Sequence, residues 1–286
     1  MNNGKRFVCV HASSLAACIG ANRYKPRHEA LEEMWKRLDP AGYDAAFARN
    51  RVLTRERVIA KVLRDNEQIA TAVAEAAMRD HASSTAAEST AETAKTAIDA
   101  AAKHLPEAEA KIVKDHVQSR VFTRFGTARE NDVFAKLADM GVAAHKHSGF
   151  LKKQMGTVRD EPWFLGGKID AISDDRTTVV EIKNRVRRLF RTVPEYERVQ
   201  LESYMHLLDL DRALLVECFT SLDARMDINV MEVARDPERW DSTIVPALSE
   251  FVRTLFGLLD DAAVQDAYVS AEDRDHFIRA AAIIIT

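Results

Sequence analysis

Two carboxylates and a lysine in the second half of the chain have the spacing expected of a divalent-cation site. Asp170 follows Gly166-Gly167-Lys168-Ile169, and Glu181-Ile182-Lys183 comes after ten intervening residues. A turn at 173–176 separates two segments of strand character, so Asp170 and Glu181 are expected on adjacent strands, at one end of a sheet. Carboxylate oxygens are ligands that Mg²⁺ prefers. The spacing therefore predicts a magnesium site.

The surroundings of Glu181 strengthen this prediction. A Glu-x-Lys triplet is common on solvated surfaces, but Glu181 stands inside the apolar segment Val179-Val180-Glu181-Ile182. Burying a carboxylate is costly unless a partner or an ion compensates it. Lys183 faces the same side of a strand as Glu181 and could hold a water near a metal that lowers the pKa of that water. Glu130, on a predicted helix after Gly126, could supply a third carboxylate.

A basic run begins directly after this strand. The residues expected to contact phosphates are Arg185, Arg187, Arg188 and Arg191, with Phe190 among them. Positive charge beside a carboxylate site fits a phosphodiester substrate. The alternative is a solvated arginine-rich loop. Phe190 is expected either to wedge against a base or to be a core residue.

Two further sets of residues could complete a site. Gln200 and Tyr204 are four residues apart on a predicted helix at 195–208, so they share one side of it. Arg6 and Ser13 flank a short apolar strand, and a serine at a helix start can either cap the helix or bind a phosphate there.

The pattern of predicted elements indicates an α/β fold with a mixed sheet. Strands are expected at 143–149, 158–165, 169–173, 177–182 and 213–219, and helices at 13–19, 30–38, 127–140, 195–208, 241–260 and 272–285. The predicted divisions are an N-terminal part of the core (1–40), a helical insertion (41–122), the catalytic core (123–225) and a C-terminal helical region (226–286).

The predicted insertion stands out because it contains almost no glycine or proline. There is no glycine between Gly42 and Gly126, and Pro106 is the only proline in that interval. Two long alanine-rich helices are expected, with a break at 80–84 and a capping-box spacing at Thr85 and Glu88. This part is expected to be a structural or oligomerisation arm.

The composition excludes several classes of protein. The 286 residues carry a net charge of −3, which argues against a globally basic nucleic-acid binder. No apolar run has the length of a membrane helix, and no secretory signal is visible. Cys9, Cys18 and Cys218 form neither a disulfide framework nor an iron–sulfur site, so a reducing intracellular compartment is expected.

Four segments, in this order, resemble the phage lambda exonuclease and YqaJ-type viral recombinase family of PD-(D/E)xK nucleases. They are residues 10–20 (Val-His-Ala-Ser-Ser-Leu-Ala-Ala-Cys-Ile-Gly), residues 126–131 (Gly-Thr-Ala-Arg-Glu-Asn), Asp170 with Glu181-Ile182-Lys183, and residues 199–205 around Gln200. The resemblance implies a restriction-endonuclease-like core, with a central mixed β-sheet flanked by helices.

The resemblance also implies a set of metal ligands. Mg²⁺, for which Mn²⁺ would substitute, is expected on Asp170, Glu181 and the carbonyl of Ile182, with Glu130 assisting. Lys183 would orient the attacking water.

Other roles carried over from the family concern DNA and the nucleophile. Gln200 would position Lys183 or the nucleophile, and Arg6 and Ser13 would hold the 5′ phosphate of DNA. Arg185, Arg187, Arg188, Arg191 and Tyr204 are expected on the DNA-binding surface.

The expected function is therefore that of a metal-dependent 5′→3′ exodeoxyribonuclease acting on duplex ends in viral or phage recombination. Expected partners are DNA, a single-strand annealing protein and a second copy of the chain, with no membrane. Two alternatives stay open: a structure-specific endonuclease with the same metal centre, and a non-catalytic DNA-binding scaffold.

Overall fold

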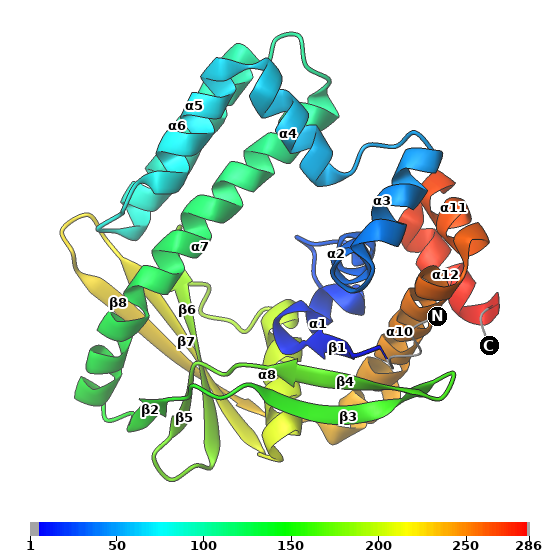
Figure 1. The fold of residues 1–286 in the computed structure, drawn as a ribbon. Coiled ribbons are helices and arrows are strands. Elements are labelled where there is room, and N and C mark those ends of the chain that lie inside the picture. Colours follow the sequence, from blue (N-terminus) through cyan, green and yellow to red (C-terminus); the bar gives the residue numbers. More distant parts are fainter. Residues whose placement is uncertain (1–5, 285–286) are drawn as a thin grey trace.

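The chain folds as a mixed α/β structure with two separate β-sheets (Figure 1). The computed structural model describes the backbone of residues 6–284 and the side chains of that range except 129–132 and 281–284. The smaller sheet has the order β1-β4-β3 and consists of β1 (Val8–His11), β3 (Leu151–Val158) and β4 (Glu161–Gly167). Strand β1 is parallel to β4, and β3 is antiparallel to it.

The larger sheet holds the predicted acidic residues. Its order is β2-β5-β6-β7-β8, and its strands are β2 (Ala144–Lys146), β5 (Ala171–Ser173), β6 (Thr178–Arg185), β7 (Arg212–Thr220) and β8 (Met226–Ala234). Only β6 and β7 are parallel neighbours in it. Parallel neighbours need a crossover, and helix α8 (Glu195–Leu208) provides it.

Helices cover both faces of this sheet. On one face, Val179 packs with Leu201 and Met205 of α8. On the other face, Ile182 packs with Val133 and Leu137 of α7 (Glu107–Asp139). Strand β6 is thus enclosed on both sides, which explains its continuous run of β-branched residues.

A second core lies against one face of the small sheet. It gathers helices around Trp35, which contacts the rings of Tyr43, Phe47 and Tyr268. The helices are α1 (Ala12–Cys18), α2 (Arg27–Leu38), α3 (Pro40–Arg49), α10 (Val245–Asp260), α11 (Ala262–Ser270) and α12 (Arg274–Ile284).

One helical stretch of this core is long and apolar enough to cross a membrane. It runs from Pro237 to Asp260 and contains α9 (Pro237–Arg239), a π-helical turn (Trp240–Ile244) and α10. Half of its most apolar window is buried inside the structure, and Leu248, Phe251 and Leu255 pack in the core around Trp35. It is therefore a core helix of this fold.

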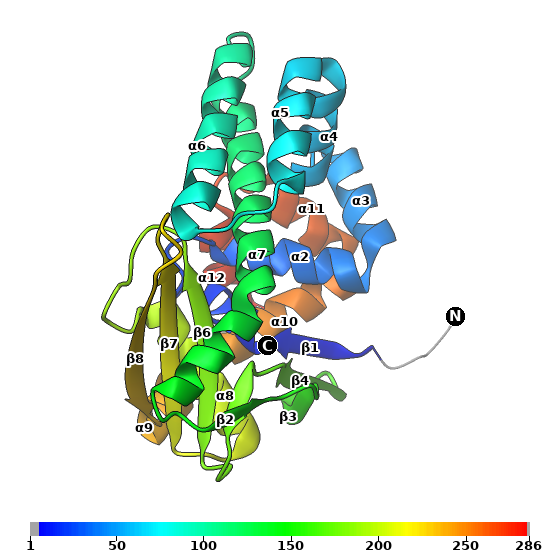
Figure 2. The same ribbon diagram turned by 90° about the vertical axis from the view of Figure 1, so that its left-hand side faces the viewer.

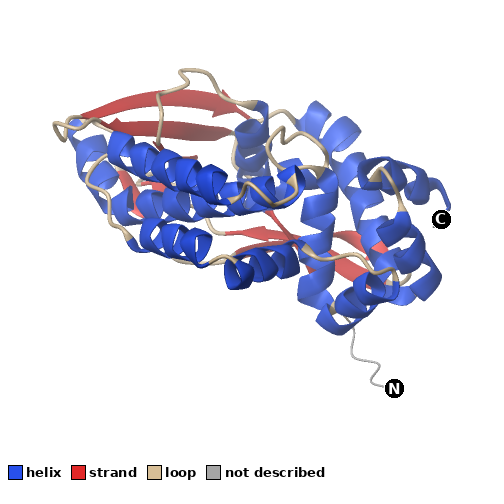
Figure 3. Cartoon of the chain, turned by 90° about the horizontal axis from the view of Figure 1, so that it is seen from above, coloured by secondary structure: helices blue, strands red, loops and turns tan. Residues whose placement is uncertain are grey.

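The helical arm stands away from both sheets at its outer end (Figures 1 and 2). It consists of α4 (Arg55–Asp65), α5 (Glu67–Met78), α6 (Ser84–Ala101) and the first half of α7. Small side chains form much of its core, so the helices can pack closely, as the view from above shows (Figure 3). The caps are Thr54, Asn66 and Ser83, each accepting a backbone N–H.

Several boundaries differ from those predicted. Helix α3, placed by the sequence in the insertion, packs on Trp35 and belongs to the second core. Helix α7 runs unbroken across the expected boundary at residue 122. The region 226–286 was predicted to be helical but opens with β8, whose alternating polar residues gave no continuous apolar signal.

Candidate active site

Glu181, Lys183 and Gln200 form one hydrogen-bonded group between β6 and α8. Lys183 Nζ donates to Glu181 Oε1 (2.7 Å) and to Gln200 Oε1 (3.0 Å). Gln200 Nε2 donates to the same Glu181 oxygen (2.9 Å) and to the hydroxyl of Tyr204 (3.0 Å). Since an ammonium can only donate, it fixes which way the Gln200 amide points.

The other oxygen of Glu181 has no such partner. Glu181 is 4% exposed, and its buried Oε2 accepts no hydrogen bond from the described residues. Burial raises the pKa of Glu181 to about 7; the charge of Lys183 opposes this rise, and that of Asp170 adds to it. An unsatisfied buried carboxylate oxygen is costly, and its place close to Asp170 and Lys183 makes this one a candidate ligand position.

Asp170 is held against the same part of β6. Its Oδ2 accepts the backbone N–H of Ile182 (2.8 Å), and its own carbonyl accepts the N–H of His147 (3.1 Å). Its negative charge acts on Glu181, Lys183 and Tyr204. The structure thus brings together the two carboxylates and the lysine that the sequence singled out.

The residues present fit a hard divalent cation. Two carboxylates, one of them with an unpartnered oxygen, provide the oxygen donors that Mg²⁺ takes while keeping several waters. Among the side chains that the structure describes, no three His, Cys, Asp or Glu residues lie close enough to form a complete metal cage. Glu130, the predicted third carboxylate, lies outside the described side chains.

Arg185 is not available to DNA, and the prediction of a phosphate contact for it was wrong. Its guanidinium donates to Glu217 (2.7 Å) and twice to Glu197 (2.6 Å each), and it is buried. The ring of Phe190 covers it, with the centroid 4.1 Å from the guanidinium carbon. Phe190 therefore packs on Arg185 and is not a free wedge.

Glu217, which the sequence reasoning missed, holds the loop after β6. It is fully buried and accepts the backbone N–H groups of Phe190 (3.2 Å) and Arg191 (2.9 Å), as well as the side chain of Asn229 (3.2 Å). The signal was present, because Glu217 interrupts the apolar segment of β7 just as Glu181 interrupts that of β6.

The remaining arginines of the loop differ from one another. Arg187 pairs with Glu88 (2.8 Å) and Glu92 (3.2 Å) of α6, which ties the loop to the arm. Arg188 and Arg191 are exposed and make no ion pair with a described side chain. These two are the members of the run that are open to a polyanion.

Arg6 and Ser13 do not form one binding site. Arg6 pairs with Glu161 (2.8 Å) and Asp260 (2.6 Å), and Glu161 is the first residue of β4. Ser13 is exposed on the first turn of α1, beside the other end of β4. The strand between them separates the two by about 15–20 Å. Only Ser13 lies at the end of β4 that leads to Asp170.

Tyr204 supports Gln200 and does not belong to a DNA-binding surface. It is 3% exposed, and burial raises its pKa far above the usual value. Its ring lies against Gly167, where an added Cβ would come within 2.9 Å of the ring. The predicted DNA contact of Tyr204 was therefore wrong, because the helix turns this side chain inward.

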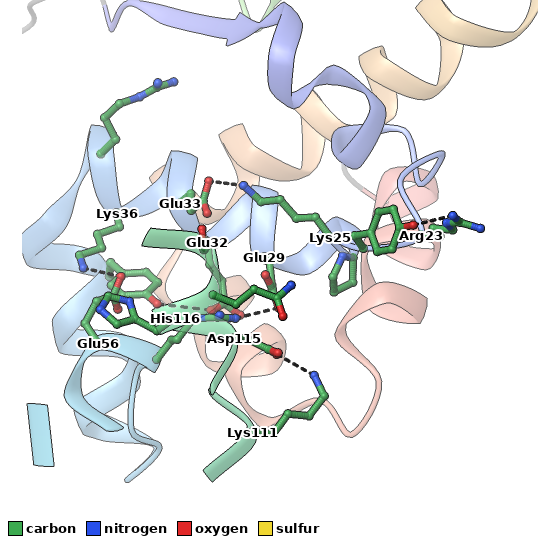
Figure 4. Close-up of a pocket in the computed structure, with 17 residues that line it drawn as sticks. Arg23, Lys25, Glu29, Glu32, Glu33, Lys36, Glu56, Lys111, Asp115 and His116 are labelled. Carbon is green, nitrogen blue, oxygen red and sulfur yellow. Dashed lines mark hydrogen bonds and ion pairs between the residues drawn. The ribbon is translucent and has the colours of Figure 1, made fainter. Parts of the chain in front are cut away.

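A charged cleft of about 1,100 Å³ lies between α2, α3, α4 and α7 (Figure 4). Many of its cations are already paired, and the residues that line it do not include the Asp170–Glu181 site. The pairs are Lys25–Glu33, Lys36–Glu56, Arg55–Glu29 and Lys111–Asp115. The cleft is thus mixed in charge rather than basic.

No protein-family model matches this chain, and no curated protein matches its sequence. Among solved structures, a phage-related exonuclease from Haemophilus somnus 129PT is similar at 17% identity and a TM-score of 0.37, over 49% of this chain and 74% of that one.

An alkaline exonuclease from Laribacter hongkongensis is similar at 17% identity and a TM-score of 0.34, over 56% and 73% of the two chains. Its complex with dAMP gives 16% identity and a TM-score of 0.31, over 75% and 93%. Similarity at this level transfers no function, so the chemistry has to be inferred from the residues of the site.

Proposed function

We propose that this chain is a metal-dependent deoxyribonuclease whose site is built on Asp170, Glu181, Lys183 and Gln200. The observation that carries the proposal is the buried, unpartnered Oε2 of Glu181, next to Asp170 and to a lysine held in place by two acceptors. A divalent cation at this position would satisfy that oxygen, which the Glu181–Lys183 pair leaves without a partner.

The ligands of the cation would be Asp170, Glu181 and the carbonyl of Ile182, with Mg²⁺ as the natural ion and Mn²⁺ as its substitute. When bound, the ion supplies a Lewis acid for the phosphoryl oxygen and lowers the pKa of a coordinated water. Glu130 is proposed to assist from α7.

The role of Lys183 follows from its hydrogen bonds. Two of its three ammonium hydrogens are directed to Glu181 and Gln200, so one remains to orient a water or a phosphate oxygen. Burial lowers the pKa of Lys183, but its hydrogen bond to Glu181 and the negative charges of Glu181, Glu197 and Asp170 together raise it. The side chain therefore stays charged and can stabilise negative charge on the phosphorus group.

The substrate is proposed to be duplex DNA with a free end, degraded 5′→3′ in phage or viral recombination, with a single-strand annealing protein as partner and a second copy of the chain as a further one. The exposed Arg188 and Arg191 would neutralise backbone phosphates, and Ser13 would contact the terminal phosphate. Exposure of the two arginines in the loop that follows β6, the strand of Glu181, supports a polyanionic substrate.

The test compares linear and covalently closed circular duplex DNA, each in Mg²⁺ and in EDTA. The variants are Glu181→Gln and Lys183→Met, and the control is Glu232→Gln, which changes an exposed residue of β8. Loss of linear DNA only, abolished by EDTA and by both variants but not by the control, is the expected result.

The other outcomes separate the alternatives. Cleavage of both substrates would identify an endonuclease with the same metal centre. No cleavage by folded protein, or cleavage that survives Glu181→Gln, would contradict the proposal.

A further inference from the structure

The small sheet keeps one of its faces uncovered. Val8, Val10 and Leu165 point into the core around Trp35. The opposite face carries the residues that alternate with them: Phe7, Cys9 and His11 along β1, Phe164 and Gly166 on β4, and Phe150, Lys152 and Gln154 before and along β3. Because Phe7 is 51% and Phe150 47% exposed, this face is apolar and open to solvent.

The aromatic rings on this face are arranged in two contacting pairs. Phe7 stacks on Phe164, with centroids 5.0 Å apart and planes inclined by 30°. Phe150 meets His11 edge to face, at 5.6 Å. Burial and the charge of Arg37 lower the pKa of His11, so this ring is neutral at pH 7 and behaves as an aromatic surface.

Gly166 leaves the space in which the ring of Phe150 lies. An added Cβ at Gly166 would lie 2.8 Å from two ring atoms of Phe150 and 2.8 Å from the sulfur of Cys9. The absence of a side chain therefore lets the ring lie directly against the sheet. An exposed ring held in this way loses little conformational entropy when something stacks on it.

Two cations lie at this face. Lys152 Nζ lies 4.8 Å and 5.0 Å from the ring centres of Phe7 and Phe164. Arg37 donates to the carbonyl of Cys9 (2.9 Å) at the edge of the sheet. Within β1, β3 and β4 the only acidic residue is Glu161, and it is paired with Arg6.

We propose that this open face, formed by Phe7, His11, Phe150, Lys152 and Phe164, binds single-stranded nucleic acid by stacking its bases. Aromatic rings with flanking cations are the means by which sheet surfaces hold unpaired strands without regard to sequence. The face also ends where β4 leads to Asp170, since Gly166 and Gly167 come three or four residues before it.

The inference deepens the proposed function and rests on it for its biological use. A nuclease that degrades one strand from a duplex end leaves the other strand unpaired close to its site. A surface that ends where β4 leads to Asp170, and that is able to stack unpaired bases, would hold the strand that is spared. The alternative occupants, a protein partner or a second copy, lack an evident need for a lysine placed over the rings.

The test measures binding in EDTA, so that it does not depend on cleavage. Fluorescence anisotropy compares a labelled oligothymidylate with an abasic deoxyribose-phosphate oligomer of the same length. The variant is the double substitution Phe7→Leu with Phe150→Leu, which keeps apolar side chains at two half-exposed positions. The control is Leu222→Ala, an exposed apolar residue in the loop after β7.

Stacking on aromatic rings contributes about 1–3 kcal/mol per base, so the wild-type chain should prefer the oligothymidylate by about 5- to 150-fold. The double variant should lose this preference while its affinity for the abasic oligomer stays unchanged, and the control should behave as wild type. Lys152→Gln should lower the salt slope of binding by about 1.

Two results would overturn the inference: equal affinity of the wild-type chain for both oligomers, or a preference that persists in the double variant. Loss of self-association in the variant with unchanged affinity for oligothymidylate would overturn it in favour of a second copy. A chain that shows the base preference but cleaves no DNA in Mg²⁺ would contradict only the proposed function.

Discussion

The ammonium of Lys183 lies 3.0 Å from the amide oxygen of Gln200, and this contact joins β6 to α8 at the candidate site. Gln200 also donates to Glu181, so one amide orients both residues of the Glu-x-Lys pair. The position of Lys183 therefore depends on a helix that the chain forms only after leaving β6.

Removing this amide should reduce catalysis without abolishing substrate binding. Gln200→Ala leaves Lys183 with one acceptor and Glu181 with one donor fewer, so DNA cleavage should slow by about 10- to 100-fold, the usual effect of losing a residue that orients a metal-site ligand. DNA affinity in EDTA should change less than twofold. Gln68→Ala, on the exposed face of α5, is the matched control. Equal activity of the two variants would remove Gln200 from the site.

Removing the ammonium of Lys183 should slow DNA cleavage more than removing the amide of Gln200 does. Lys183→Met should lower the rate of cleavage by about 10²–10⁴-fold, because it deletes both a proton-handling group and a positive charge at the reacting phosphate. Single-turnover cleavage measures this loss. A rise in KM with kcat unchanged would show instead that Lys183 only binds DNA.

The raised pKa of Glu181 predicts a pH-dependent effect of Mg²⁺ on stability. Without metal the folded chain keeps this proton up to about pH 7, whereas the unfolded chain releases it near 4.5. The free energy of unfolding should therefore fall as the pH rises through this window, and a cation can replace the proton only where the carboxylate is ionised.

Thermal unfolding with and without Mg²⁺, in the absence of DNA, measures this effect. The rise in Tm caused by Mg²⁺ should be larger at about pH 8 than at about pH 5.5. It should vanish in Glu181→Gln and persist in Glu232→Gln. A rise of equal size at both pH values would argue against Glu181 as the ligand.

Arg185 should contribute to stability rather than to DNA binding. Arg185→Met leaves Glu197 and Glu217 buried without their cation, which should lower the free energy of unfolding by about 3–5 kcal/mol. Arg188→Met, at an exposed position in the same loop, should change stability by less than about 0.5 kcal/mol. Urea titrations of both variants provide the comparison, and equal midpoints would contradict the assignment.

DNA binding should distinguish the exposed arginines from Arg6. Replacing Arg188 or Arg191 with glutamine should reduce the slope of log affinity against log salt by about 1 each. Arg6→Gln should leave the slope unchanged, because Arg6 is neutralised by Glu161 and Asp260. A reduced slope for Arg6→Gln on duplex DNA would contradict the assignment of Arg6 to a structural ion pair.

The sequence predicted the centre of the site better than its surroundings. Glu181 and Lys183 could be placed because a strand signal follows the turn at 173–176, and Gln200 because the helix at 195–208 has clear bounds. Asp170 was expected within a strand but lies one residue before β5. These are local relationships. The partners of Arg6 and Arg185 come from residues far along the chain, so no spacing rule could reveal that the two arginines are neutralised.

For the fold, too, local patterns were predicted better than relationships that depend on distant parts of the chain. Strand β3 was missed because Lys152, Lys153 and Gln154 interrupt any apolar alternation, and β8 because Asp227, Asn229 and Glu232 interrupt its apolar residues. The break at Asn66 was missed because residues 55–78 contain neither glycine nor proline, so only the capping side chain of Asn66 marks it. The separation into two sheets depends on where the chain leaves β4, at Lys168-Ile169, which no local pattern specifies.

The most direct test of the central claim is a crystal structure of the chain soaked with Mn²⁺, with anomalous scattering used to locate the ion. A single strong peak is expected within coordination distance of Glu181 Oε2 and the carboxylate of Asp170, and it should be absent in Glu181→Gln. A peak elsewhere, or Oε2 of Glu181 bonded to a protein group in the crystal with no ion beside it, would contradict the account.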